Sequence, residues 1–205
     1  SNVITFSEIE NGTCTLTANV TPDGGTVAWS SDNSAVAPVS GNGSTATVKA
    51  LSEGSATITA TYTVKGKTVK DSCTITVQKA ASTLSLTGLS YPGSGTVDSF
   101  TISGTLSSNY ALVRAECTGS ATSNALGISV SDTASPFYFG EGVYTADMSI
   151  LTSYFIEQYR SLYNLYSAAA GLLGADNSVT MNVTGTCYDT SGNHISFAFT
   201  YVIYS

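Results

Sequence analysis

The sequence predicts an all-β protein made of two β-sandwich domains, the second of which contains one long inserted α-helix. Three observations lead to this prediction. Short stretches of alternating apolar and polar residues, separated by Gly, Pro, Asn and Asp turns, run through most of the 205 residues. The charge and the aromatic content change near Ala80, which indicates a domain boundary there. Residues 147–173 change to the apolar spacing of a helix.

The first domain, residues 1–79, is predicted to be a small sandwich of short strands. Turn signals separate the strands, among them Pro22-Asp23-Gly24-Gly25 and Lys65-Gly66-Lys67. The predicted strands cover residues 13–20, 26–30, 35–39, 45–50, 55–64 and 69–77. This succession is enough to build two packed sheets.

A set of residues in this domain resembles a known family. The residues are Trp29-Ser30-Ser31, Val36-Ala37, Val39, Gly54 and the run Ala56-Thr57-Ile58-Thr59-Ala60. Over about residues 1–79 the chain resembles bacterial immunoglobulin-like group 2 domains. The resemblance implies an immunoglobulin-like sandwich, of the kind used as a spacer, stalk or adhesive module on bacterial surface proteins and bacteriophage particles. It therefore implies display outside a cytoplasm, and it names no ligand.

The second domain, residues 80–205, also begins with strands, and we expect it to be immunoglobulin-like in its sandwich layout. The family resemblance does not extend to it. Its predicted strands cover residues 83–89, 100–106, 111–117, 127–131, 137–144, 178–188 and 194–204. The last two are predicted to form a hairpin through Asp189-Thr190-Ser191-Gly192-Asn193.

The helix is predicted over about residues 147–173, with Asp147 as its N-cap. Its apolar face consists of Leu151, Phe155, Tyr159, Leu162, Tyr166, Ala169 and Leu173. A helix with so few charges is normally buried, either in its own domain or against a neighbouring copy. Both placements remain open at this point.

Charge is sparse and unevenly distributed. Only 10% of the residues are charged, and the net charge is -7. Up to Ala80 five lysines face six acids, whereas beyond it two arginines face eight acids. An acidic second domain repels nucleic acid and anionic membranes, and no apolar run is long enough to span a bilayer. A surface rich in Ser and Thr is common in secreted β proteins.

The four cysteines are divided equally between the two domains. This distribution favours disulfides between Cys14 and Cys73 and between Cys117 and Cys187. The alternative is buried free thiols. Such bridges would suit an oxidising exterior.

The sequence offers little for catalysis. His194 is the single histidine and lies beside a tight turn, so a nucleophile has no obvious base. The acids Asp132, Glu141, Asp147, Asp176 and Asp189 all lie in or beside predicted turns, and Asp189 lacks the further ligands of a calcium loop. We therefore expect no enzyme activity, no metal and no cofactor.

Aromatic residues are concentrated in the second domain, which contains eleven of the twelve Tyr and six of the seven Phe. The candidates for a ligand or assembly surface are Phe137, Tyr138, Tyr144, Tyr154, Tyr159, Tyr163 and Tyr166. Residues 137–144 could form a platform for sugar rings or a strand buried on both faces.

These features predict a non-catalytic, extracellular structural or adhesive protein. It would be displayed on a cell surface, or be a subunit of a virion or filament, with an immunoglobulin-like spacer domain. The alternative is a carbohydrate-binding module that uses the aromatic residues of the second domain. We expect its partners to be other protein subunits, including further copies in a homo-oligomer, or a host-surface ligand such as a glycan. Nucleic-acid binding and membrane insertion are not expected.

Overall fold

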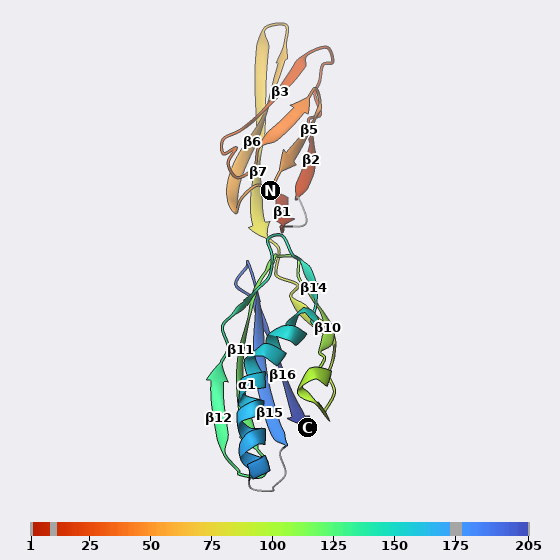
Figure 1. The fold of residues 1–205 in the computed structure, drawn as a ribbon. Helices are drawn as coiled ribbons and strands as arrows, with labels where there is room; N and C mark the ends of the chain where they lie inside the picture. Colours follow the sequence, from red (N-terminus) through yellow and green to blue (C-terminus); the bar gives the residue numbers. More distant parts are fainter. Residues whose placement is uncertain (1, 9–11, 173–177, 205) are drawn as a thin grey trace. The chain divides into compact units, whose positions relative to one another are not determined.

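The computed structural model describes residues 2–8, 12–172 and 178–204, with some side chains of the second half of the helix left out. The chain folds into two compact units, Ser1–Ala81 and Ser82–Ser205. Figure 1 shows strands of both units and the single α-helix among the described residues. The prediction of an all-β chain with one long helix is confirmed.

Two sheets form the first unit. The first sheet has the order β1 (Asn2–Phe6), β7 (Lys67–Lys79), β6 (Gly54–Val64) and β3 (Thr26–Ser31). The second has the order β2 (Thr13–Thr17), β5 (Thr45–Lys49) and β4 (Val39–Asn42). β1 pairs with β7 in parallel, and the other pairs are antiparallel. Val48, Ile58 and Ile75 are fully buried in the core of this unit.

Trp29 links the two sheets of the first unit. It lies on β3, and its indole Nε1 donates a hydrogen bond to the carbonyl of Gly43 at 3.0 Å. Gly43 is in the turn between β4 and β5 and has a φ of 73°, a conformation that favours glycine. The tryptophan therefore packs against the core and fixes the position of that turn.

Of residues 35–39, predicted to be a strand, only Val39 belongs to one. The backbone N–H groups of Val36 and Ala37 both donate to the carbonyl of Asn33, and the strand β4 begins only at Val39. Ala37 is fully buried, so the apolar residues of this segment fill the core without strand pairing. Burial alone produced the apolar pattern that resembles a strand.

The second unit is built on a six-stranded sheet. Its order is β12 (Ser129–Thr133), β11 (Leu112–Ser123), β15 (Val179–Asp189), β16 (His194–Ile203) and β9 (Ser94–Gly95), with β13 (Phe137–Tyr138) also paired to β11. A smaller sheet has the order β14 (Thr145–Asp147), β10 (Ser103–Ser107) and β8 (Ser85–Ser90). The helix α1 (Ile150–Leu172) packs on β11 and β15 (Figure 1).

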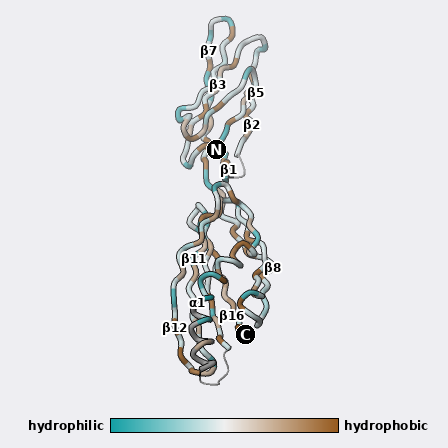
Figure 2. Tube along the Cα trace, viewed as in Figure 1, coloured by the Kyte–Doolittle hydropathy of each residue, from teal (hydrophilic) through white to brown (hydrophobic). Residues whose placement is uncertain are grey.

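One face of the six-stranded sheet forms the core of the second unit. Along β15, Val179, Met181 and Val183 are buried, while the residues between them point to the other face. The change of hydropathy from residue to residue can be followed along the strands in Figure 2. Phe155 of α1 lies in edge contact with Phe199 of β16, with their ring centroids 5.3 Å apart.

Two predicted boundaries in this unit are wrong. Asp147 is the last residue of β14 rather than the helix N-cap, and its carboxylate accepts a hydrogen bond from the N–H of Ser149 at 2.8 Å. The helix begins at Ile150. Of the predicted strand 137–144, only Phe137–Tyr138 pairs as a strand, because the glycine Gly142 has a φ of 66° and turns the chain. The side chains predicted for the far end of the apolar helix face, Leu162, Tyr166, Ala169 and Leu173, lie outside the described residues.

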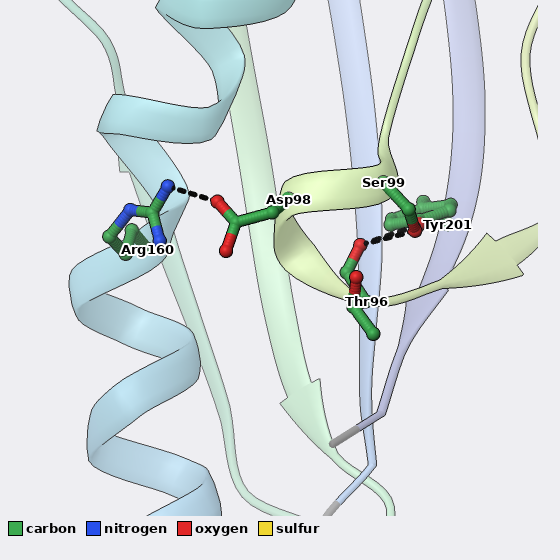
Figure 3. A network of polar contacts seen from close by, with 5 residues as sticks. All are labelled: Thr96, Asp98, Ser99, Arg160 and Tyr201. Atoms are coloured by element: carbon green, nitrogen blue, oxygen red, sulfur yellow. Dashed lines mark hydrogen bonds and ion pairs between the residues drawn. The ribbon is translucent and has the colours of Figure 1, made fainter.

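A polar network fixes the 3₁₀ helix η1 (Val97–Ser99) between α1 and β16 (Figure 3). Arg160 of α1 forms an ion pair with Asp98 at 2.5 Å, and both side chains are exposed. On the other side, the hydroxyl of Tyr201 donates to the carbonyl of Thr96 at 2.8 Å and lies 3.1 Å from the hydroxyl of Ser99. These bonds position η1 beside the aromatic core.

Asp189 is the most constrained acid of the described chain. It is 3% exposed, and its Oδ2 accepts from the hydroxyls of Ser82 at 2.6 Å and Ser108 at 2.8 Å. Its Oδ1 accepts from the N–H of Ser191 at 3.0 Å and from the hydroxyl of the same residue at 2.6 Å. Burial raises the pKa of Asp189, but these hydrogen bonds outweigh it, and the net shift is downward. The carboxylate thereby joins the first residue of the unit, the β10–β11 loop and the β15–β16 turn.

We expect the substitution Asp189→Asn to destabilise the second unit by about 2 kcal/mol at pH 7, because charge-assisted hydrogen bonds are lost. A carboxylate whose pKa is lowered by folding stabilises the protein above its unfolded pKa of about 3.9, and this stability is lost as the pH falls through the folded pKa. The difference between wild type and variant should therefore shrink toward pH 3. Urea titrations followed by tyrosine near-UV circular dichroism measure it.

Fluorescence of Trp29 serves as the internal control for this experiment, because it is the only tryptophan and lies in the first unit. Its transition should be the same in both proteins. An equal loss of stability at pH 7 and pH 3 would contradict the role of the charged carboxylate.

Gly185 leaves space for the aromatic ring of Phe197 in the core. A Cβ at this position would lie 2.2 Å from the ring of Phe197, so the substitution Gly185→Ala should cost about 1–3 kcal/mol of unfolding free energy through overpacking. Gly140→Ala is the matched control, since its Cβ would meet nothing closer than 3.7 Å. Urea denaturation of both variants checks this, and equal stabilities would refute the packing argument.

Candidate functional site

The aromatic residues selected from the sequence have different environments in the structure. Tyr138 is 67% exposed, whereas Phe137 and Tyr144 are half-buried. Phe137 lies in edge contact with Phe139 and Tyr154, with centroid distances of 5.4 and 6.0 Å. Within this group, only Tyr138 offers most of its side chain to a ligand.

The tyrosines of helix α1 belong mainly to the interior. Tyr154 is half-buried and donates its hydroxyl to the carbonyl of Ser135 at 2.5 Å. Tyr159 and Tyr163 are 6% and 8% exposed and belong to the core of the second unit, so they are not part of an exposed surface. The side chain of Tyr166 lies outside the described residues. The described part of α1 therefore buries its tyrosines mainly within its own domain.

The hydroxyl of Tyr159 is buried without a hydrogen-bond partner among the described residues. It lies against Gly119 of β11, where a Cβ would come within 2.0 Å of it. Burial raises the pKa of Tyr159 to about 12. This tyrosine is therefore neutral at physiological pH and fills space below the sheet.

The outward face of the six-stranded sheet is a broad polar surface. Alternation along the strands directs to this face Arg114, Glu116, Thr118, Ser120 and Thr122 of β11, Thr180, Asn182, Thr184, Thr186 and Tyr188 of β15, and His194, Ser196, Ala198, Thr200 and Val202 of β16. The helix packs on the opposite, buried side. We call this surface the outward face.

Strand register arranges these side chains in rows. One row contains Tyr138, Arg114, Tyr188 and His194, which are directly paired across β13, β11, β15 and β16. Directly paired residues have neighbouring side chains. Together with Glu116 we call these residues the Arg114 cluster.

Contacts within the Arg114 cluster are close. The guanidinium carbon of Arg114 lies 4.2 Å from the ring centroid of Tyr188, and Arg114 Nε donates to Glu116 Oε1 at 2.6 Å. The ring of His194 lies 5.7 Å from that of Tyr188. The cluster thus combines aromatic rings, a cation and a carboxylate at one end of the outward face.

The ionisation of the cluster follows from these contacts. The hydrogen bond from Arg114 lowers the pKa of Glu116, and a further hydrogen bond from the Tyr188 hydroxyl acts in the same direction. Donating to Glu116 in turn raises the pKa of Tyr188, because the phenolate would lose that bond. Arg114 and Glu116 are therefore both charged and largely neutralise each other.

Two further rows produce a shallow hollow in the outward face. The register pairs Ser131, Ser120, Asn182 and Thr200 in one row, and Thr133, Thr118, Thr184 and Ala198 in the next. The hollow has a volume of about 670 Å³ and is lined by Thr118, Gly119, Ser120, Ser131, Asp132, Thr133, Asn182 and Thr184. Most of its lining side chains are small and carry hydroxyl groups. Asp132 pairs with Gly119, so its side chain alternates to the opposite face of the sheet.

Sequence reasoning selected Tyr138 from the outward face and missed the rest. The neighbourhood of Tyr188 and His194 follows from the register of the local hairpin, so that signal was present in the sequence. Arg114 and the hollow depend on the pairing of β11 with β15 and β12, strands that are distant in sequence. No local pattern carries that information.

The cysteines are free thiols in the structure. Cys14 on β2 and Cys73 on β7 both pack against the core of the first unit. Burial, and then the charge of Cys73, raise the pKa of Cys14. Cys117 is paired with Gly185 and Cys187 with Ala115, so these two lie diagonally on the buried face of adjacent strands. The two disulfides stay a prediction.

Thiol reactivity should divide the cysteines into two classes. Cys117 and Cys187 are at most 1% exposed, and burial raises the pKa of each to about 12, so few thiolates exist at pH 7.5. We expect iodoacetamide to label them only after denaturation, and Cys14 and Cys73 to react sooner. Peptide mass spectrometry after timed labelling checks this.

The intact mass before reduction is the accompanying control, because each disulfide lowers it by two hydrogen atoms. Rapid labelling of Cys117 in the native protein would contradict the buried placement.

In the described part of the chain, no group of three or more His, Cys, Asp or Glu side chains could hold a metal ion. Within the same residues, no helix is long and apolar enough to cross a membrane.

The fold of the first unit defines its class as an immunoglobulin-like β-sandwich. Residues 7–73, which lie in the first unit, match the family model of the bacterial Ig-like domain (group 2). The resemblance noted in the sequence is thus confirmed. The second unit is outside the match.

A crystal structure of a tetra-tandem repeat in the extending region of a large adhesion protein aligns with 98% of this chain at 16% identity and a TM-score of 0.30. The chain spans about half of that protein's length, since 48% of it is covered. No curated protein matches the chain. The Ig-like domain supports a structural or adhesive role.

Proposed function

We propose that the protein is a non-catalytic extracellular structural or adhesive protein, displayed on a cell surface or forming part of a virion or filament. The observation that carries the proposal is the group 2 Ig-like domain at residues 7–73. In this view the first unit is a spacer. The second unit supplies the contact surface.

The chemistry of the second unit supports a binding role over a catalytic one. The carboxylate of Asp189 is buried and accepts four hydrogen bonds, which leaves it no capacity to act as a base. Arg114 and Glu116 are paired with each other, and His194 packs beside Tyr188. A general base must reach the proton that it removes, and these groups are engaged with their neighbours.

The outward face is the surface that we assign to partners. It is broad and polar, and Tyr138 stands exposed at one end. A protein subunit, a further copy of the chain or a host-surface ligand would all approach the unit here. Antiparallel sheets commonly leave one face to solvent, so the clustering of Tyr138, Arg114, Tyr188 and His194 is what favours this face as a contact surface.

Immunogold electron microscopy tests the location. Antibodies raised against the purified chain should label the outer surface of producing cells, or particles and filaments released from them. Pre-immune serum is the control. Label confined to the cytoplasm of intact and sectioned cells would overturn the proposal.

A further inference from the structure

The hollow in the outward face continues into a second one. That second hollow has a volume of about 290 Å³ and is lined by Tyr91, Asn182, Val183, Thr184, Ala198, Phe199 and Thr200. The two hollows share Asn182 and Thr184. The two hollows therefore lie side by side across β12, β11, β15 and β16. We call the two hollows together the outward groove.

The outward groove has the dimensions of an oligomeric ligand. Neighbouring strands lie about 4.8 Å apart, so the distance from β12 to β16 across three such steps is roughly 14 Å. Both hollows are shallow, and most of the residues that line them have short side chains. A chain molecule can lie across the strands without disturbing the sheet.

Hydrogen-bonding groups line the floor at regular intervals. Hydroxyl groups both donate and accept, so Thr118, Ser120 and Thr184 can match the hydroxyls of a ligand in either sense. Asn182 Oδ1 accepts from the hydroxyl of Thr200 at 2.7 Å, which holds the amide in one orientation. Its NH₂ group is then a fixed donor within the groove.

Tyr91 lines the second hollow with an aromatic side chain. This side chain is 38% exposed, and its ring packs beside Phe199, a residue of the buried face, at a centroid distance of 5.4 Å. An aromatic ring that is fixed in position offers a flat apolar face at low entropic cost. The polar residues of the outward groove and the aromatic ring of Tyr91 together suit a molecule that has both hydroxyl groups and apolar C–H faces.

Charge narrows the class of ligand further. The second domain carries two arginines against eight acids, and no basic residue lines the outward groove. Polyanions are therefore repelled. An extended peptide would pair with a strand edge rather than with a sheet face, since its backbone groups need hydrogen-bond partners. A neutral, hydroxyl-rich chain suits the groove best.

We propose that the outward groove binds a neutral oligosaccharide, with Asn182, Thr184 and Ser120 contacting its hydroxyls and Tyr91 packing against a sugar ring. The assignment rests on the proposed adhesive function and names its ligand class. It places the sugar contacts at a site distinct from the exposed residue Tyr138, which is four strand positions away along β11 from the Thr118 row.

A glycan microarray that contains neutral, sialylated and sulfated oligosaccharides provides the first test, with the fluorescently labelled full chain as probe. Binding to neutral oligosaccharides is expected. Binding restricted to acidic ones, or none at all, overturns the assignment. Immunogold labelling measures the location of the protein separately. It therefore distinguishes a failure of this inference from a failure of the proposed adhesive function.

Variants locate the site by calorimetry with the best neutral oligosaccharide of the array. Tyr91→Ala should weaken binding about tenfold, through loss of the aromatic contact. Thr184→Arg should abolish binding because it fills the groove. Thr180→Arg is the matched control, since it adds the same side chain to the outward face of the same strand at a position outside the groove lining, and it should bind as the wild type does.

Two outcomes would contradict the assignment of the outward groove to an oligosaccharide. If Tyr138→Ala abolishes binding and Thr184→Arg leaves it intact, the Arg114 cluster is the sugar site and the groove is not. If light scattering shows that the wild type is a dimer, that Thr184→Arg is a monomer and that no glycan binds, the groove is an interface between copies. Circular dichroism spectra of all variants must match the wild type, and a variant that fails this criterion is replaced by Ser120→Arg.

Discussion

The pairing of β11 with β15 is the constraint on which the second unit depends. It runs without interruption from Arg114 and Tyr188 to Ser123 and Val179, and it fixes which side chains face the core. A shift of register by one residue would turn the buried residues outward and the hydroxyl groups inward. The aromatic core, the support for α1, the Arg114 cluster and the outward groove would all be lost together. Such a shift is unfavourable because it would expose the apolar core. The packing of the buried face therefore also fixes the positions of the polar side chains on the outward face.

Local features of the chain were readable from the sequence, and long-range ones were not. The β15–β16 hairpin could be predicted because its turn residues, Asp189 to Asn193, lie between two alternating runs. The group 2 Ig-like unit could be recognised because Trp29 and Gly54 stand in a short, characteristic stretch. The groove could not be predicted, since it needs four strands from separate parts of the chain in one register. Turn and strand were confused at residues 35–39, where buried residues such as Ala37 pack without strand pairing.

The sequence predicted correctly that Asp189 lies at a turn but did not predict its tertiary hydrogen bonds. The sequence placed it in a turn, and its carboxylate does accept from the N–H of Ser191. The tertiary fold adds the hydroxyls of Ser82 and Ser108, which come from segments far away in sequence. A carboxylate can be buried at low cost only when its oxygens are satisfied in this way. The same residue thus closes a hairpin and fastens the start of the unit to it.

The two faces of the six-stranded sheet obey different rules, and this difference separates stability from binding in the second unit. On the inner face, close packing leaves little freedom: Gly185 and Gly119 are needed so that Phe197 and Tyr159 fit. On the outward face, side chains such as Thr184 and Ser120 contribute little to the core, and water satisfies them equally well. Substitutions there change the surface at small cost to the fold. A sheet of this kind can keep one fold and vary its ligand, which is the property that an adhesive module requires.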